Sequence, residues 1–342
     1  MNRLEPGVWV TSKELVSPES LSRMIDRLDR INAGRAYIQV VGRGDSYYSS
    51  ALLPPAEELV QPFDALRKAI TEASGKTFHI SAWMNVNLVW GFERRRPLSA
   101  VHIVNRHPEW ITVDENGTSM LDYSSSNLEE VFGPYVDPGV AGVREFTEEI
   151  ASEISNYDIE EVHLDFIRYP FRSFGFNPIA LAEYRDWLNE EGLSNGTDSF
   201  DRFRIDAVTR QVSMISETVR SKGKKLSCAV YDDYSERAVH ERLQPWLDWL
   251  ENGLIDAAVV MAYGKEPEEV ISRVKNIRSL HGSLNNIRIG LGAFNYASRW
   301  DEFIELIKQV RELEPDEVTL FALSSVDDEL CGRLRALQEE VR

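Results

Sequence analysis

Three features of this 342-residue sequence predict an α/β fold, a single (β/α)8 TIM barrel. Strand-like and helical hydrophobic patterns alternate from one end of the chain to the other. The strand-like segments number eight, the number that closes a parallel barrel, and they are near-continuous apolar runs of the kind that helices cover. Neither a change in composition nor a low-complexity linker divides the chain, so we expect one domain over residues 1–342. The alternative is an open doubly wound sheet, but no GxGxxG opens a helix after the first strand.

The expected strands are rich in β-branched and aromatic residues and cover residues 7–11, 36–41, 78–87, 162–169, 226–231, 257–263, 287–293 and 318–323. The first expected helix begins with a capping serine, Ser17, and a proline at its first position, Pro18. The other expected helices cover residues 63–74, 140–157, 203–222, 243–252, 267–280, 300–313 and 327–341. Glycines that suit a left-handed helix stop follow several of them, as at Gly75, Gly223 and Gly253.

The longest stretches without a regular pattern follow the third and fourth strands, at residues 87–139 and 171–200. In a TIM barrel both loops leave the C-terminal face, where the active site is built. Their aromatic residues either wall an extended groove or pack the loops down; these residues are Trp90, His107, Trp110, Tyr123, Tyr135, Phe171, Phe174 and Phe176.

Charge and composition exclude several classes of protein. A net charge of −18 disfavours nucleic acid as a partner, because phosphate binding needs clustered lysine and arginine. No apolar run is long enough to cross a membrane. The first residues contain no apolar signal core, so we expect a cytoplasmic chain, or one of the cell envelope or secreted if the sequence is a trimmed mature form. Two cysteines without a CxxC motif indicate neither a disulfide framework nor a structural zinc site, and the oligomeric state is unknown.

The most informative segment is VHLDFIRYP, residues 162–170. An apolar strand pattern ends in Asp165, and Pro170 then prevents the strand from continuing. A carboxylate at the C-terminal end of a barrel strand is held rigidly at the catalytic face. We therefore interpret Asp165 as a catalytic residue; the alternative is a structural salt bridge to Arg168 or Arg43.

Polar and aromatic residues cluster at the other strand ends as well. The candidate substrate-binding residues are Arg43, Tyr48, Trp83, Asn85, Trp90, His163, Arg168, Tyr169, Tyr231, Tyr263 and Asn295. Flat rings can cover the C–H faces of sugars while amides and guanidinium groups bind hydroxyls, so this mixture predicts a carbohydrate site.

Some of these residues have alternative interpretations. Trp83 suits either the barrel core or the site, whereas Asn85 favours the site because a buried amide needs partners. His163 and Asp165 form an H-x-D pair that could bind a metal, but no further histidine motif accompanies it, which favours a structural or substrate-contacting histidine. Asp232 and Asp233 follow the fifth strand, and strand alternation allows only one of them to face the site.

The segments GVWVT (7–11), WMN (83–85) and HLDFIRYP (163–170) resemble the glycosyl hydrolase-like 10 family. YSS (48–50), HPEW (107–110), YVDPG (135–139) and GLG (290–292) extend the similarity over most of the chain. The resemblance implies a (β/α)8 barrel with Asp165 as a catalytic residue. It also implies a glycan substrate, such as a bacterial envelope polysaccharide like peptide-free peptidoglycan, and relatives that are usually exported or lipid-anchored.

We therefore predict a glycoside hydrolase that acts on a polysaccharide or oligosaccharide. Glycoside cleavage usually uses two carboxyl groups, here Asp165 with Asp232 or Asp233, unless an N-acetyl group of the substrate replaces the second acid. We expect no cofactor and no metal. The alternatives are a non-catalytic carbohydrate-binding barrel and a metal-dependent hydrolase that uses His163 and Asp165.

Overall fold

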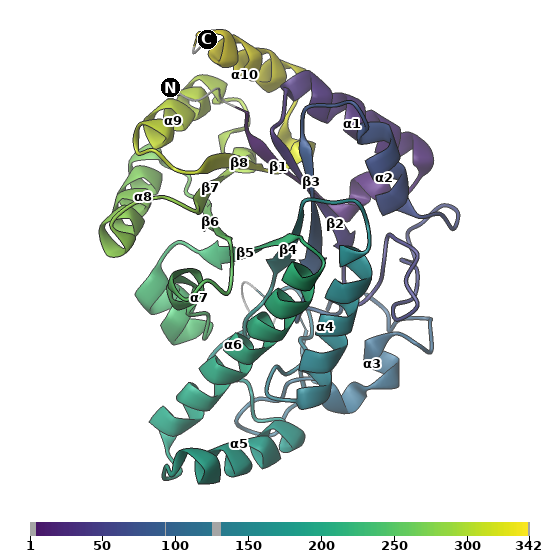
Figure 1. Ribbon diagram of the computed structural model, residues 1–342, viewed down its shortest axis with the longest axis vertical. Helices are drawn as coiled ribbons and strands as arrows, with labels where there is room; N and C mark the ends of the chain where they lie inside the picture. The colour runs from purple at the N-terminus through teal and green to yellow at the C-terminus, as the bar shows by residue number, and fades with distance from the viewer. Residues whose placement is uncertain (1–4, 93, 125–130, 341–342) are drawn as a thin grey trace.

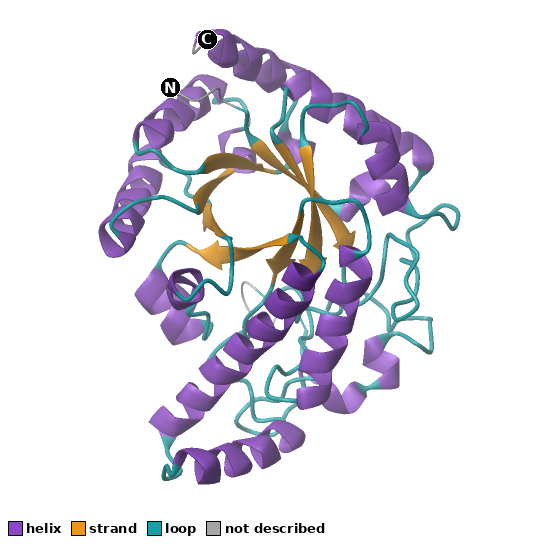
Figure 2. Ribbon diagram, viewed as in Figure 1, coloured by secondary structure: helices purple, strands orange, loops and turns teal. Residues whose placement is uncertain are grey.

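The computed structural model describes residues 5–92, 94–124 and 131–340, in which eight parallel strands close into a barrel in sequence order (Figures 1 and 2). The strands are β1 (Gly7–Val10), β2 (Arg35–Val41), β3 (His79–Asn85), β4 (Glu161–Asp165), β5 (Lys225–Tyr231), β6 (Ala257–Ala262), β7 (Ile287–Gly292) and β8 (Glu317–Phe321). Each overlaps a segment expected from the hydrophobic pattern, so the predicted barrel is confirmed. β1 pairs with both β2 and β8, which closes the ring.

Helices surround the strands on the outside of the ring (Figure 2). They are α1 (Pro18–Ile31), α2 (Ala65–Ala73), α3 (Ile103–Arg106), α4 (Ala141–Ser155), α5 (Pro178–Glu191), α6 (Thr197–Ser221), α7 (Trp246–Glu251), α8 (Pro267–His281), α9 (Trp300–Glu312) and α10 (Asp328–Glu340). The predicted cap of α1 is present, because the Ser17 hydroxyl accepts a hydrogen bond from the Ser20 backbone N–H at 3.1 Å. No helix in these described ranges is both long and apolar enough to cross a bilayer.

Besides the short helical turns after β3, two helical segments lie where the sequence analysis expected loops or a different helix. α5 occupies the loop after β4; Asn177 caps it, Pro178 begins it and Gly192 ends it in the left-handed conformation. Its weak hydrophobic periodicity hid it, because its buried residues pack against the start of α6 and not against the barrel. A π-helical segment, Tyr234–Glu241, precedes α7 and shortens the helix expected there.

Strand alternation divides the apolar residues between two sides of the barrel wall. Val8 and Val10 of β1 point outward into the main core beneath the helices, whereas Trp9 points inward and packs against Tyr37. Gly290 on β7 provides room for the Trp9 indole, since a Cβ there would lie 2.7 Å from the ring. The inward-facing residues therefore determine the packing and the chemical groups of the barrel interior.

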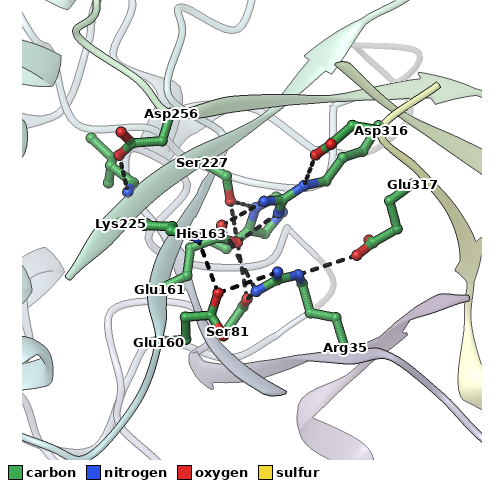
Figure 3. Close-up of polar contacts among 12 residues, drawn as sticks. Arg35, Ser81, Glu160, Glu161, His163, Lys225, Ser227, Asp256, Asp316 and Glu317 are labelled. Carbon is green, nitrogen blue, oxygen red and sulfur yellow. Dashed lines mark hydrogen bonds and ion pairs between the residues drawn. The ribbon is translucent and has the colours of Figure 1, made fainter. Parts of the chain in front are cut away.

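A charged network, which we call the polar plug, fills the barrel interior at the N-terminal ends of the strands (Figure 3). It consists of Arg35, Ser81, Glu161, Ser227, Arg288 and Glu317. Glu161 accepts two hydrogen bonds from Arg288, both at 2.9 Å, and one each from Ser81 and Ser227 at 2.9 and 2.7 Å. Burial alone would raise the pKa of Glu161, but Arg288 and Arg35 outweigh it and lower the pKa to about 2.

Candidate active site

A cavity of about 700 Å³ lies at the opposite end of the barrel, where the C-terminal ends of the strands meet. Seven residues proposed from the sequence line it: Arg43, Trp83, Asn85, Asp165, Arg168, Tyr231 and Tyr263. They come from the ends of β2 to β6 and from the turns that follow, as expected for the catalytic face of a TIM barrel. The structure therefore brings half of the candidate residues into one site.

Asp165 is the last residue of β4, and the whole residue is 7% exposed. Its Oδ1 accepts the backbone N–H of Phe166 at 2.7 Å and lies 3.5 Å from the Arg168 guanidinium. Burial raises the pKa of Asp165, although Arg168 and the Phe166 N–H oppose the shift. An acid held in this way can keep its proton at a higher pH than an exposed aspartate.

The turn after Asp165 has an unusual backbone. Phe166 has φ of +54°, a left-handed conformation that costs a non-glycine residue roughly 1–2 kcal/mol. This turn ends the strict alternation of β4, so Arg168 lines the cavity while Tyr169 is buried away from it. The rings of Phe166 and Tyr231 lie 4.6 and 4.9 Å from the Arg168 guanidinium carbon.

Trp83 and Asn85 line the cavity together with Asp165. Asn85 is the register partner of Asp165 on β3. Its Oδ1 accepts the Trp83 indole N–H at 2.9 Å, and its amide donates to the Gly42 carbonyl at 2.7 Å. The buried amide is thus satisfied, and it ties β3 to the turn that follows β2.

Two further acids line the cavity and were not assigned a role from the sequence. Asp45 is buried, and its Oδ1 accepts the Arg43 backbone N–H at 2.8 Å. Burial raises the pKa of Asp45. Glu58 is more exposed; it accepts from the Tyr47 hydroxyl at 3.2 Å and pairs with Arg94 at 2.8 Å. The GRGD sequence after the second strand, residues 42–45, is the signal that could have revealed Asp45.

The structure places Asp232 and Asp233 outside the set of described residues that line the cavity. Asp232 follows the inward-facing Tyr231, so it points outward and accepts from Arg273 at 2.6 Å. Asp233 caps the π-helical segment by accepting the Glu236 backbone N–H at 3.1 Å. The expectation that one of the two faces the cleft is therefore not met, and Asp45 and Glu58 stand at the cavity wall instead.

The remaining candidates also lie away from the cavity lining. His163 is buried below it, where Nε2 accepts the Trp9 indole N–H at 3.2 Å and Nδ1 pairs with the Ser227 hydroxyl at 2.9 Å. Burial lowers the pKa of His163 to about 3, so the imidazole is neutral. Tyr169 donates to Asp137 at 2.8 Å. His163 and Tyr169 thus have structural partners.

Tyr48, Trp90 and Asn295 are held by similar internal contacts. Tyr48 donates to Glu153 at 3.0 Å, and Trp90 donates to the Arg95 carbonyl at 3.0 Å. The Asn295 amide donates to the carbonyls of Tyr263 and Gly264 at 3.2 and 3.1 Å. Asn295 therefore contacts the site through the backbone of Tyr263.

Aromatic residues of the long loops mostly pack against one another. Tyr135 and Phe174 are buried, and Trp110 stacks on His107 at 3.8 Å. The exposed rings at the cavity are instead Phe132 and Phe294, which are 59% and 49% exposed. These two rings offer flat apolar surfaces to a ligand.

No group of three or more histidine, cysteine, aspartate or glutamate side chains is arranged to hold a metal ion in the part of the chain that the structure describes. His163 and Asp165, the H-x-D pair, lie on the same side of β4, but His163 already uses both ring nitrogens in hydrogen bonds. The described donors of this pair therefore do not form a metal-binding set.

The family model described as glycosyl hydrolase-like 10 matches residues 6–282. The chain belongs to this family. It is also 24% identical over 224 residues to a glycosyl hydrolase, YngK, of Bacillus subtilis (strain 168); the match covers 62% of this chain and 40% of that protein. The chain thus spans less than half the length of this curated relative.

Solved structures share the barrel fold of this glycosyl hydrolase-like 10 protein. The PgaB (BpsB) glycoside hydrolase domain from Bordetella bronchiseptica superposes with a TM-score of 0.66 at 14% identity, covering 98% of both chains. Alpha-L-fucosidase isoenzyme 2 from Paenibacillus thiaminolyticus has a TM-score of 0.67 at 12% identity and covers all of this chain and 49% of its own. These solved structures show that the barrel fold is shared.

Proposed function

We propose that this protein is a glycoside hydrolase that cleaves O-glycosidic bonds in a polysaccharide or oligosaccharide. The observation that carries the proposal is Asp165, a buried acid with a raised pKa at the end of a barrel strand and on the wall of a large cavity. A general acid must keep its proton until the leaving oxygen needs it, and burial favours that state. Asp165 therefore protonates the leaving group.

Asp45 is our choice for the second carboxyl group, in place of Asp232 or Asp233. It lines the same cavity and is rigidly held by the Arg43 backbone N–H. Hydrolysis needs a group that either attacks the sugar or activates water, and a carboxylate can do both. An N-acetyl group on the substrate could replace Asp45 in this role.

The neighbouring residues suit a sugar. Trp83, Tyr231 and Tyr263 present rings to the cavity, while Phe132 and Phe294 stand exposed at its wall. Rings of this kind stack on sugars, so several successive sugar units can bind. A bacterial envelope glycan, such as peptidoglycan strands without stem peptides, is the first substrate to test, because membership of the glycosyl hydrolase-like 10 family implies a substrate of this kind.

Product analysis on a panel of defined glycans, including those strands, tests the proposal. We expect cleavage by the parent protein and a loss on the order of 10²-fold or more in Asp165→Asn. Asp328→Asn on α10, a largely exposed residue, is the control and keeps parental turnover. Binding without cleavage of any glycan would indicate a carbohydrate-binding barrel, and near-normal turnover in Asp165→Asn would refute the assignment.

A further inference from the structure

The charge of the cavity wall is opposite to that of the whole chain. The chain has a net charge of −18, yet six basic and three acidic described residues line the cavity. The basic residues are Lys13, Arg43, Arg94, Arg168, Arg237 and Arg273. A surplus of positive charge in one concave region of an acidic protein attracts anionic ligands to that region.

Arg168 is a buried cation with only one acidic partner. It is 4% exposed, and its ion pair with Asp165 is long, at 3.5 Å. Its Nε atom is buried without a hydrogen-bond partner. Burying a guanidinium group in this way is costly unless another group supplies the missing negative charge. A ligand in the cavity can supply it.

Arg237 brings a second guanidinium to the Tyr231 ring. Its guanidinium carbon lies 4.7 Å from the centre of the Tyr231 ring, and that of Arg168 lies 4.9 Å from it. The two arginines come from different segments, the turn after β4 and the π-helical segment after β5, and both line the cavity. Guanidinium groups bind oxyanions with two parallel hydrogen bonds, so two of them on the wall of one cavity favour an anionic ligand.

Arg43 and Arg94 make another side of the cavity basic as well. The Arg43 guanidinium makes no hydrogen bond or ion pair with any residue in the described ranges, whereas Arg94 is paired with Glu58. Burial and the nearby Arg94 lower the pKa of Arg43. This side adds to the positive field but is not needed for the contact beside Tyr231.

We propose that the cavity binds a sugar with an anionic substituent, and that this oxyanion contacts Arg168 and Arg237 beside Tyr231. The inference rests on the proposed glycoside hydrolase function and narrows its substrates to acidic glycans. The anionic sugar lies next to Asp165, because Arg168 pairs with that carboxyl group. A carboxylate and a sulfate share the required chemistry, so the test includes both.

Binding to matched sugars tests the subsite without relying on turnover. The probes are glucuronate against glucose, N-acetylmuramate against N-acetylglucosamine, and glucose 6-sulfate against glucose. Titration is followed by tryptophan fluorescence, since Trp9 and Trp83 line the cavity. We expect an anionic member to bind about 10-fold more tightly than its neutral partner, because hydrogen bonds to charged groups are stronger. High salt should reduce this preference.

Variants locate the contact. Arg237→Gln, whose side chain is only partly buried, and Arg168→Gln should each reduce the preference for the anionic sugar, and the double variant should abolish it. Arg168→Lys keeps the buried charge and serves if Arg168→Gln does not fold, as judged by circular dichroism. Lysine lacks the fork of arginine, so a reduced preference is expected. Arg30→Gln on α1 is the matched control and should keep the full preference.

The outcomes separate this inference from the proposed function. Equal binding of every pair, or a preference that survives in the double variant, overturns the anionic subsite. Cleavage of neutral and acidic glycans at the same rate also overturns it and leaves the hydrolase intact. A preference that depends on Arg168 and Arg237, in a protein that cleaves none of the glycans, supports the subsite and overturns the hydrolase.

Discussion

Two carboxyl groups on β4, one at each end of the barrel, differ in their hydrogen bonds and in the direction of their pKa shifts. Glu161 and Asp165 both face the barrel interior and are both buried. Glu161 accepts four hydrogen bonds of 2.7–2.9 Å and has a pKa lowered to about 2. Asp165 has one close hydrogen bond and a distant arginine, and its pKa is raised. The neighbours, more than burial, decide which acid has a lowered pKa and which has a raised one.

The largest effect that this comparison predicts is on stability at the N-terminal end. Glu161→Gln leaves Arg288 and Arg35 buried without their counter-charge, so the free energy of unfolding should fall by about 3–5 kcal/mol. Urea unfolding measures the change. Glu160→Gln, its more exposed neighbour, is the control and should cost about 1 kcal/mol or less. An equal loss in both variants would contradict a special role for the polar plug.

The same residue predicts the direction of a pH effect. Because the pKa of Glu161 is lower in the folded protein than its ordinary value of 4.5, its contribution is complete above pH 4.5 and is lost as the pH falls toward about 2. Urea unfolding of the parent and of Glu161→Gln at several pH values checks this. The difference between the two proteins should shrink in acid; a constant difference would refute the linkage.

At the C-terminal end of the barrel, we expect substitution of the acid to change turnover and not to reduce stability. Asp165→Asn should lose turnover on the order of 10²-fold or more while its stability at neutral pH stays equal to or above that of the parent. The reason is that a raised pKa makes the ionised Asp165 unfavourable in the folded state, and asparagine removes that charge. The same urea titration, run beside the product assay, measures both quantities. A clear loss of stability in this variant would mean that Asp165 belongs to the structural acids.

The smallest effect concerns Asp233. Its side chain caps the π-helical segment, so Asp233→Ala should cost about 1 kcal/mol of stability and leave turnover within a factor of two. Thermal unfolding and the product assay compare it with Asp165→Asn. A loss of turnover as large as that of Asp165→Asn would restore Asp233 as the second catalytic carboxyl group.

The barrel and the position of Asp165 could be predicted because both depend on local patterns. Alternation and apolar runs define the strands, and the strand end places Asp165 at the catalytic face. Residues beyond a strand end follow no such rule: the left-handed Phe166 turns Arg168 into the cavity and Tyr169 away from it. Asp45 lies at the cavity wall because a turn follows a register shift in β2. Hydrophobic periodicity does not predict the position of a residue in such a turn.

The polar plug also has a consequence for the order in which the chain can fold. Arg35 and Glu161 belong to the first half of the barrel, whereas Arg288 and Glu317 arrive with β7 and β8, so the bonds that join them span 127–282 residues. The first six strands contain Glu161 and Arg35 but not Arg288, which donates two of the four hydrogen bonds to Glu161. We therefore expect β7 and β8 to stabilise the barrel as they close it, because only then does Glu161 gain Arg288 as a counter-charge.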